Sequence, residues 1–126
     1  MIIDITDDFK NALNQMETTS NHLFITGRAG TGKSTLLQYF RESTHKKIAV
    51  LAPTGLAALH VKGQTVHSFF GFPAHPIHSD HIKKRKDHKI YKNLDTIIID
   101  EVSMLRADIL DAIDHFMRLN GKNRSL

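Results

Sequence analysis

The chain has 126 residues, with 17 Lys and Arg against 13 Asp and Glu, which gives a formal net charge of +4. This length suits one domain with a core of its own. The absence of cysteine excludes a disulfide framework and a thiolate metal site. No apolar run approaches the roughly 20 residues that a membrane span needs, and residues 1–5 lack the basic and apolar regions of a signal peptide. We therefore expect a cytoplasmic protein that mildly favours anionic partners and has no membrane partner.

Residues 1–20 are predicted to contain a leading helix. Thr6 is a good N-cap, and the two aspartates that follow it suit the positive end of a helix dipole. The polar residues 18–21 have turn chemistry and should end the helix. Its apolar stripe consists of Phe9, Ala12, Leu13 and Met16.

Residues 27–34, Gly-Arg-Ala-Gly-Thr-Gly-Lys-Ser, match the phosphate-binding P-loop pattern G-x-x-x-x-G-K-[ST]. Glycines let the backbone wrap so that its N–H groups face a phosphate, while Lys33 supplies a charge and Ser34 a hydroxyl for Mg²⁺. An apolar segment, residues 22–26, precedes the loop as an expected strand, and a helix should run from about Lys33 to about Arg41. A glycine-rich turn without a ligand is the less favoured interpretation. The candidate nucleotide-binding residues are Gly27, Ala29, Gly30, Thr31, Gly32, Lys33, Ser34 and Thr35.

The next segments predict a parallel α/β arrangement. Residues 48–52 form a continuous apolar run, typical of a strand covered on both faces, so that strand, helix and strand give a right-handed βαβ unit. A short helix should open at Leu56 and end at Gly63, with another helical turn near Val66. We expect the nearby phenylalanines to pack in the core rather than to stack on bases. They are Phe69, Phe70 and Phe72.

Residues 73–92 lose the apolar periodicity and are predicted to be a surface insertion. His75, His78 and His81 could bind a transition metal adventitiously, but a dedicated zinc site would need a fuller ligand set. The insertion also carries a run of cations, which is either a solvated face or a contact for nucleic-acid phosphates. These cations are Lys83, Lys84, Arg85, Lys86, Lys89 and Lys92.

Residues 94–99 are predicted to be a strand that ends in Asp100 and Glu101. Adjacent carboxylates at the end of a buried strand are costly unless they meet a cation. Following a P-loop, Asp100 is suited to hold Mg²⁺ together with Ser34, and Glu101 to orient and activate a water against the γ-phosphate. A last helix over residues 106–119 should cover one face of the sheet.

Four segments together resemble one family, the superfamily 1B DNA helicases of the RecD/Pif group, in their first RecA-like motor domain. Residues 27–35 resemble motif I, residues 52–58 motif Ia, and residues 98–105 motif II. Residues 63–71 resemble the Thr-x-His-Ser-Phe element of the Pif branch. The middle two segments make the resemblance specific, because motifs I and II alone indicate only a P-loop ATPase.

The resemblance implies an α/β P-loop NTPase fold, a parallel sheet flanked by helices, in an incomplete motor domain. Its parts would be the leading helix (1–20), the P-loop and motif Ia (22–60), the Thr-x-His-Ser-Phe element (63–72), the insertion (73–92), and the Walker B strand and helix (94–119). It implies ATP and Mg²⁺ as cofactors, Lys33 and Glu101 as catalytic residues, and Ser34 and Asp100 as magnesium ligands. It also implies contact with single-stranded DNA, although a turn at Thr54–Gly55 and a helix cap at His67 are the alternative roles. The implied DNA-binding residues are Thr54, Gly55, Thr65, His67 and Ser68.

Two departures qualify the resemblance. Lys10 stands where the family usually has an adenine-reading glutamine. Motif III, the second motor domain and its arginine finger do not occur in the sequence, so we expect the chain to bind nucleotide, hydrolyse it slowly and not unwind DNA. The alternatives are a helicase-loader-like ATPase of another clade and a nucleotide-dependent binding module without turnover.

Overall fold

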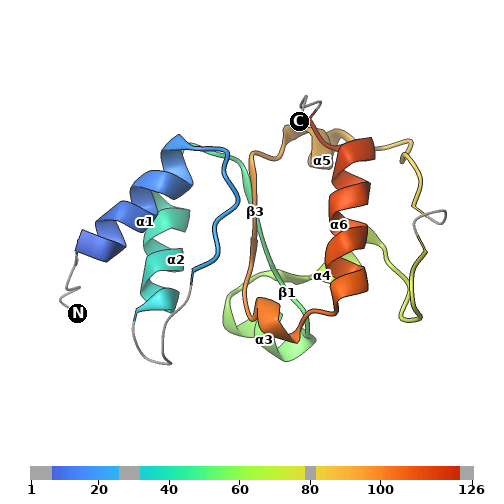
Figure 1. Ribbon diagram of the computed structural model, residues 1–126, viewed down its shortest axis with the longest axis horizontal. Coiled ribbons are helices and arrows are strands. Elements are labelled where there is room, and N and C mark those ends of the chain that lie inside the picture. The colour runs from blue at the N-terminus through green and yellow to red at the C-terminus, as the bar shows by residue number, and fades with distance from the viewer. Residues whose placement is uncertain (1–6, 26–31, 79–81, 123–126) are drawn as a thin grey trace. The chain divides into compact units, whose positions relative to one another are not determined.

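The computed structural model describes residues 7–25, 32–78 and 82–122, and the chain divides into two compact units, residues 1–46 and 47–126. Figure 1 labels the helices α1 to α6 and the strands β1 and β3. Within the described ranges, none of the helices is long and apolar enough to cross a membrane.

The described residues of the first unit form two helices, α1 (Asp7–Thr18) and α2 (Lys33–Ser43). Both confirm the helices predicted from the sequence. The helices pack through half-buried apolar side chains, and the ring of Phe9 meets the ring of Tyr39 edge-on at 6.0 Å. Helix α2 buries Leu36 and Phe40, which orient its first turn.

The strand expected over residues 22–26 is not found in the described part of that segment. Residues 21–25 have irregular backbone, and Thr26 lies outside the described residues. Phe24 is 74% exposed. An apolar run becomes a strand only when a neighbouring strand pairs with its backbone, and the ladders of the described residues join other segments. The predicted βαβ unit around the P-loop is therefore not confirmed.

The second unit is built on a parallel sheet in the order β2-β1-β3. Strand β1 (Ile48–Ala52) lies between β2 (Gln64–Thr65) and β3 (Thr96–Ile99). Leu51 pairs with Gln64 on one side and with Ile99 on the other. The strand predictions for residues 48–52 and 94–99 are confirmed, with the second beginning two residues later than expected. The parallel sheet confirms the predicted fold class.

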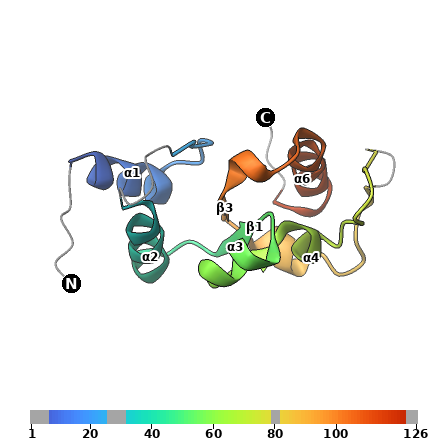
Figure 2. The same cartoon turned by 90° about the horizontal axis from the view of Figure 1, so that it is seen from below.

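In the described part of the second unit, four helices and a short 3₁₀ turn, η2 (Val102–Met104), surround these strands. They are α3 (Gly55–His60), α4 (Val66–Phe70), α5 (Lys89–Asn93) and α6 (Ala107–Asn120). In Figure 2, α6 lies above the strands and α3 lies below them. The predicted helices near 56, 66 and 106–119 are confirmed.

The core of the second unit is aromatic. Phe70 is fully buried, and its ring lies 5.1 Å from Phe116 and 5.2 Å from Phe72. Phe69 meets Phe70 edge-on at 4.9 Å. These contacts confirm the packing role predicted for the three phenylalanines. Burying large rings between α4 and α6 supplies much of the hydrophobic stabilisation of this unit.

The segment 73–92 is more structured than the sequence analysis predicted. It ends in helix α5, and both Ile82 and Tyr91 belong to the buried core. These two apolar side chains anchor the segment in the core. They lie nine residues apart and are not part of a periodic apolar stripe, so the sequence pattern did not reveal them. What a lack of periodicity did predict correctly is that most of the segment is exposed.

Candidate nucleotide and nucleic-acid site

The described end of the P-loop is a helix start. Gly32 adopts a left-handed conformation (φ 96°) and serves as the N-cap of α2, with its carbonyl accepting a hydrogen bond from the Leu36 N–H at 2.8 Å. Glycine is the residue that takes this conformation without strain. Lys33 and Ser34 follow in the first turn with exposed side chains. The first N–H groups of α2 have no partner within the helix and, with the helix dipole, favour an anion. The remaining candidates, Gly27, Ala29, Gly30 and Thr31, lie outside the described residues.

Asp100 and Glu101 follow the carboxyl end of β3, as predicted. The Asp100 N–H donates to the Leu51 carbonyl at 2.9 Å, which extends the β1–β3 pairing by one residue and fixes the backbone of this half-buried aspartate. Glu101 is exposed and has a left-handed backbone (φ 54°). For a residue with a Cβ this conformation costs about 1–2 kcal/mol. Such strain is typical of positions that serve a function.

Thr54 and Thr65 cap the two helices that follow them. The Thr54 hydroxyl accepts from the Ala57 N–H at 3.2 Å, and the Thr65 hydroxyl accepts from the Ser68 N–H at 3.2 Å. The Ser68 hydroxyl accepts from the Gln64 side chain at 2.8 Å. The hydroxyls thus have a structural role in addition to any contact with a ligand. Gly55 is the first residue of α3, and its Cβ position is open space.

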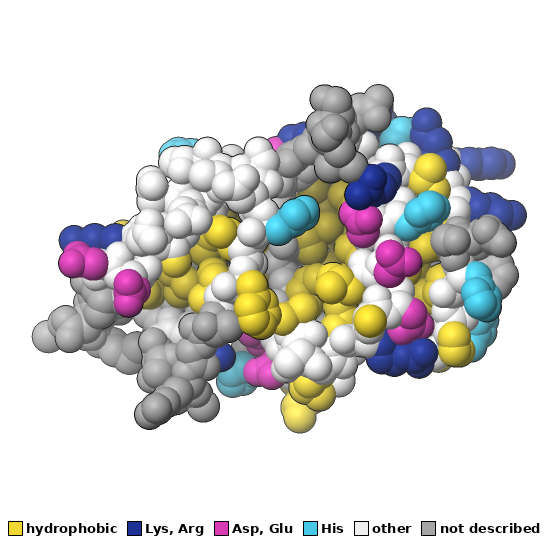
Figure 3. All heavy atoms as spheres, viewed as in Figure 1, with side chains coloured by type: hydrophobic (Ala, Val, Ile, Leu, Met, Phe, Trp, Pro, Cys, Tyr) yellow, Lys and Arg dark blue, Asp and Glu magenta, His cyan; other side chains and the backbone are white. Residues whose placement is uncertain are grey.

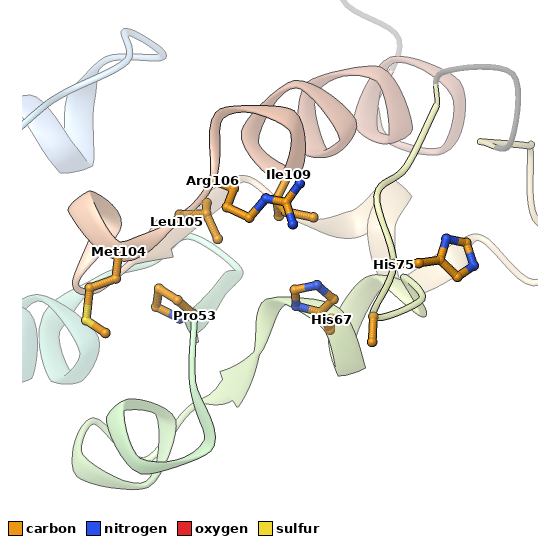
Figure 4. Close-up of a pocket in the computed structure, with 8 residues that line it drawn as sticks. Pro53, His67, His75, Met104, Leu105, Arg106 and Ile109 are labelled. Carbon is orange, nitrogen blue, oxygen red and sulfur yellow. The ribbon is translucent and has the colours of Figure 1, made fainter.

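His67 projects from α4 beside a hollow of about 150 Å³. Figure 4 shows His67 on one side of this hollow and Arg106 on the other, with Pro53 near the end of β1. Arg106 precedes α6 and forms an ion pair with Asp108, with the nitrogen and oxygen 3.0 Å apart. The hollow therefore combines an imidazole and a guanidinium close to the motif residues at the carboxyl end of the sheet, and such groups can contact phosphates.

Arg106 is the residue of this group that the sequence analysis missed. A cation directly before a helix opposes the helix dipole, and this anomaly, five residues after the Asp-Glu pair, is the signal that could have identified it. The Asp108 carboxylate in the first turn offsets the unfavourable charge.

The histidine cluster of the insertion offers no metal centre in the described part of the chain. His75 and His78 are exposed, and His81 lies outside the described residues. The His75 ring nitrogen lies 3.1 Å from the Pro76 carbonyl oxygen. Over residues 7–25, 32–78 and 82–122, no group of three or more His, Cys, Asp or Glu side chains is arranged to hold a metal ion.

A parallel sheet flanked by helices, a glycine-rich loop leading into a helix, and an Asp-Glu pair at the end of a strand define an α/β protein of the P-loop NTPase class. A family model described as PIF1-like helicase matches residues 4–124. The chain belongs to the PIF1-like helicase family.

Individual relatives agree with this assignment. The ATP-dependent DNA helicase PIF1 of Saccharomyces cerevisiae is 35% identical over 90% of the chain, and Pif1 of Bdellovibrio bacteriovorus is 37% identical over 86%. The chain spans only 14% and 26% of these two relatives. The structure of Bacteroides Pif1 in complex with ADP-AlF3 and single-stranded DNA is 38% identical over 93% of this chain and 28% of that one, with a TM-score of 0.83. Pif1 from Candida albicans is 32% identical over 93% of this chain and 28% of that one, with a TM-score of 0.77.

Proposed function

We propose that this chain forms the nucleotide-binding part of an ATP-dependent DNA helicase that couples ATP hydrolysis to movement on single-stranded DNA. The observation that carries the proposal is the Asp100–Glu101 pair at the carboxyl end of a parallel strand, in a chain of the PIF1-like helicase family. The relatives are named as ATP-dependent DNA helicases. Membership of this family does not favour a helicase-loader-like ATPase.

The phosphate-binding role falls to α2 and the loop before it. Lys33 and Ser34 present an ammonium and a hydroxyl in the first turn of the helix, with Thr35 beside them. Residues 27–32 complete the predicted loop. A lysine at this position neutralises the β- and γ-phosphates, and the free N–H groups of the first turn add directed donors. The structure of the Bacteroides relative with ADP-AlF3 supports a nucleotide as the ligand.

Two side chains, taken one by one, offer the kind of oxygen that magnesium binds. Ser34 offers a hydroxyl oxygen and Asp100 a carboxylate oxygen, and Mg²⁺ prefers oxygen ligands while keeping several waters. When bound, the ion would offset negative charge on the phosphates.

Glu101 is suited to take a proton from a water molecule. Its side chain is exposed, and its left-handed backbone is held by the Met104 N–H, which donates to the Glu101 carbonyl at 3.0 Å. The backbone turn therefore fixes the position of the Glu101 Cα, from which the side chain extends. A positioned carboxylate is a suitable general base.

Single-stranded DNA is the proposed polymer ligand, and the DNA-bound Bacteroides structure supports it. The proposed contacts lie at the starts of α3 and α4, and one of them, His67, lines the hollow. They are Thr54, Gly55, Thr65, His67 and Ser68. Small polar groups at helix starts can hold phosphates without reading bases.

The experiment that tests nucleotide binding is titration calorimetry of Mg²⁺-ATP with the chain and with Lys33→Ala. We expect the substitution to weaken binding at least about tenfold, since contacts to charged groups are worth about 1.5–3 kcal/mol. Lys47→Ala removes the same charge from an exposed position and should bind like the unaltered chain. Asp100→Asn should reduce only the part of the affinity that depends on Mg²⁺. A folded Lys33→Ala variant with unchanged affinity would contradict the proposal.

A further inference from the structure

Five lysines of the second unit form one exposed surface, which we call the lysine surface. All five side chains are exposed, and they occur within ten residues of the chain. In Figure 3 the dark blue side chains gather along the right-hand edge of the molecule, where Figure 1 draws the segment that leads into α5. The lysine surface consists of Lys83, Lys84, Lys86, Lys89 and Lys92.

The backbone under the lysine surface is fixed by a buried side chain. Asn120, the last residue of α6, is 1% exposed. Its side-chain oxygen accepts from the Arg85 N–H at 2.6 Å, and its amide nitrogen donates to the Lys83 carbonyl at 3.2 Å. The amide also donates to the Phe116 carbonyl at 3.1 Å. A buried amide with all these partners is costly to disturb, so residues 83–85 are tied to the core.

Arg85 is exposed like its lysine neighbours but differs from them because its guanidinium contacts residues of the core. Its guanidinium donates to the Phe70 carbonyl at 2.6 Å and lies 5.8 Å from the centre of the Phe116 ring. Ile82 and Tyr91, buried on either side, complete the anchoring. The lysines thus stand on an ordered backbone, which lowers the entropy lost when a ligand binds to them.

The charge of the lysine surface is not balanced by carboxylates of the described chain. The ion pairs found over residues 7–25, 32–78 and 82–122 involve other cations, and they join Arg106 to Asp108, Arg118 to Asp114 and Lys122 to Asp95. Asp87 is the carboxylate within residues 83–92, so the sequence there carries one negative charge and the five positive charges of the lysine surface. Clustered like charges raise the local potential and favour a polyanion.

The lysine surface lies away from the motif residues. Asn120 anchors it at the C-terminal end of α6, whereas Arg106 and the Asp100–Glu101 pair precede the N-terminal end of the same helix. A helix of this length, Ala107–Asn120, spans about 21 Å at 1.5 Å per residue. One phosphate group cannot touch both places, so the lysine surface is a separate contact.

We propose that the lysine surface binds the phosphodiester backbone of nucleic acid, without regard to sequence, at a distance from the strand contacts near His67. The choice of nucleic acid among polyanions rests on the proposed function. Lysine side chains on a fixed backbone supply point charges that neutralise phosphates and release counterions. The backbone could belong to a single strand or to a duplex, and the two are distinguished by the experiment.

The test compares the chain with Lys84→Gln/Lys86→Gln/Lys89→Gln. Binding to a labelled single strand and to a labelled duplex is followed by fluorescence anisotropy from about 50 to about 200 mM salt, without nucleotide. Binding weakens as salt rises, so the slope of log K against log salt is negative. Each lost phosphate contact should make this slope shallower by about 0.7 for a single strand and about 0.9 for a duplex. Lys47→Gln, which changes an exposed lysine outside the lysine surface, should leave both slopes unchanged.

The outcomes separate this proposal from the proposed function. A shallower slope on either DNA, with Mg²⁺-ATP binding unchanged, supports the lysine surface and shows which form it prefers. Unchanged slopes on both DNAs overturn it, whatever the calorimetry gives. Polyglutamate, a polyanion without phosphates, serves as a further ligand. If the triple lysine variant lost as much affinity for polyglutamate as for DNA, the proposal would also be overturned, because the surface would then be a general anion site. If the unaltered chain and Lys33→Ala bound Mg²⁺-ATP equally, that result would instead contradict the proposed function alone.

Discussion

At the scale of single residues, Gly63 shows how closely two segments of the second unit approach. A Cβ built at this position would lie 2.3 Å from the Val50 carbonyl oxygen. The Gly63 N–H donates to the Ala58 carbonyl at 2.8 Å, which ends α3 and directs the chain into β2. The glycine is required here for space: the neighbour is backbone within β1 and cannot turn aside as a side chain can.

We predict that Gly63→Ala destabilises the second unit by about 1–3 kcal/mol, the usual range for overpacking. Chemical denaturation followed by circular dichroism measures the change. Gly55→Ala is the matched control, because a Cβ there meets nothing within 4 Å. We expect it to be neutral or to stabilise by up to about 1 kcal/mol, since alanine is the better helix former. Equal losses in the two variants would disprove the steric account.

At the scale of elements, α5 is a helix of five residues that is held by one side chain. The Tyr91 hydroxyl donates to the Phe69 carbonyl at 2.7 Å, and its ring lies 4.7 Å from Phe116. A helix this short is not stable by itself. The helix therefore forms because Tyr91 contacts α4 and α6. The same contact holds in place the two lysines of the lysine surface that lie on α5, Lys89 and Lys92.

Tyr91→Phe should cost about 1 kcal/mol or slightly more, because it removes the hydrogen bond and leaves the Phe69 carbonyl without that donor. The ring contacts remain, so the fold is kept. Thermal unfolding compares this variant with Tyr39→Phe, whose tyrosine is 39% exposed and should lose little. If Tyr91→Phe were as stable as the unaltered chain, the hydroxyl would not contribute to docking α5.

At the scale of the whole molecule, each unit has its own polar network. In the first unit the Glu17 carboxylate joins α1 to the segment after α2. It accepts hydrogen bonds from the Thr44 hydroxyl and, at 3.0 Å, from the His45 N–H. Lys46 donates to the Met16 and Thr19 carbonyls, both at 2.8 Å. All these partners lie within residues 1–46, so a change at Glu17 should be felt in that unit.

This network gives the first unit a specific pH dependence. The Thr44 hydroxyl, and then the His45 N–H, hold the pKa of Glu17 below its ordinary value. A lowered pKa in the folded state means that the ionised form stabilises folding. That contribution is complete above the unfolded pKa of about 4.3 and disappears as the pH falls through the lower, folded value.

Hydrogen exchange, corrected for intrinsic rates, should therefore show a loss of protection in α1 and α2 below about pH 4. Glu17→Gln should be less protected than the unaltered chain at neutral pH and should approach it in acid. Glu42→Gln, on α2, is the control, because Glu42 accepts a hydrogen bond from Gln38 and does not join the two helices. A Glu17→Gln variant with the same pH dependence as the unaltered chain would contradict the role of this carboxylate.

Local patterns were sufficient for most elements and for the class of protein. Apolar spacing predicted α1, α2 and α6, and continuous apolar runs predicted β1 and β3. The P-loop and the Asp100–Glu101 pair indicated a P-loop NTPase, and the two middle motifs indicated the family. These features depend on residues close together in the chain, so a sequence displays them directly. The assigned roles of the site residues stay predictions.

Other features depended on partners far away in the chain. The largely apolar residues 22–25 do not form a strand, because a strand needs a partner for its backbone and apolar side chains do not supply one. Asn120 lies one residue beyond the predicted last helix, yet its side chain holds the backbone of Arg85, which lies 35 residues earlier. Tyr91 orders α5 through a carbonyl 22 residues away. The sequence by itself thus determined the periodic elements and the motifs, while the tertiary structure decided which polar and aromatic groups meet, because those pairings exist only once the chain has folded.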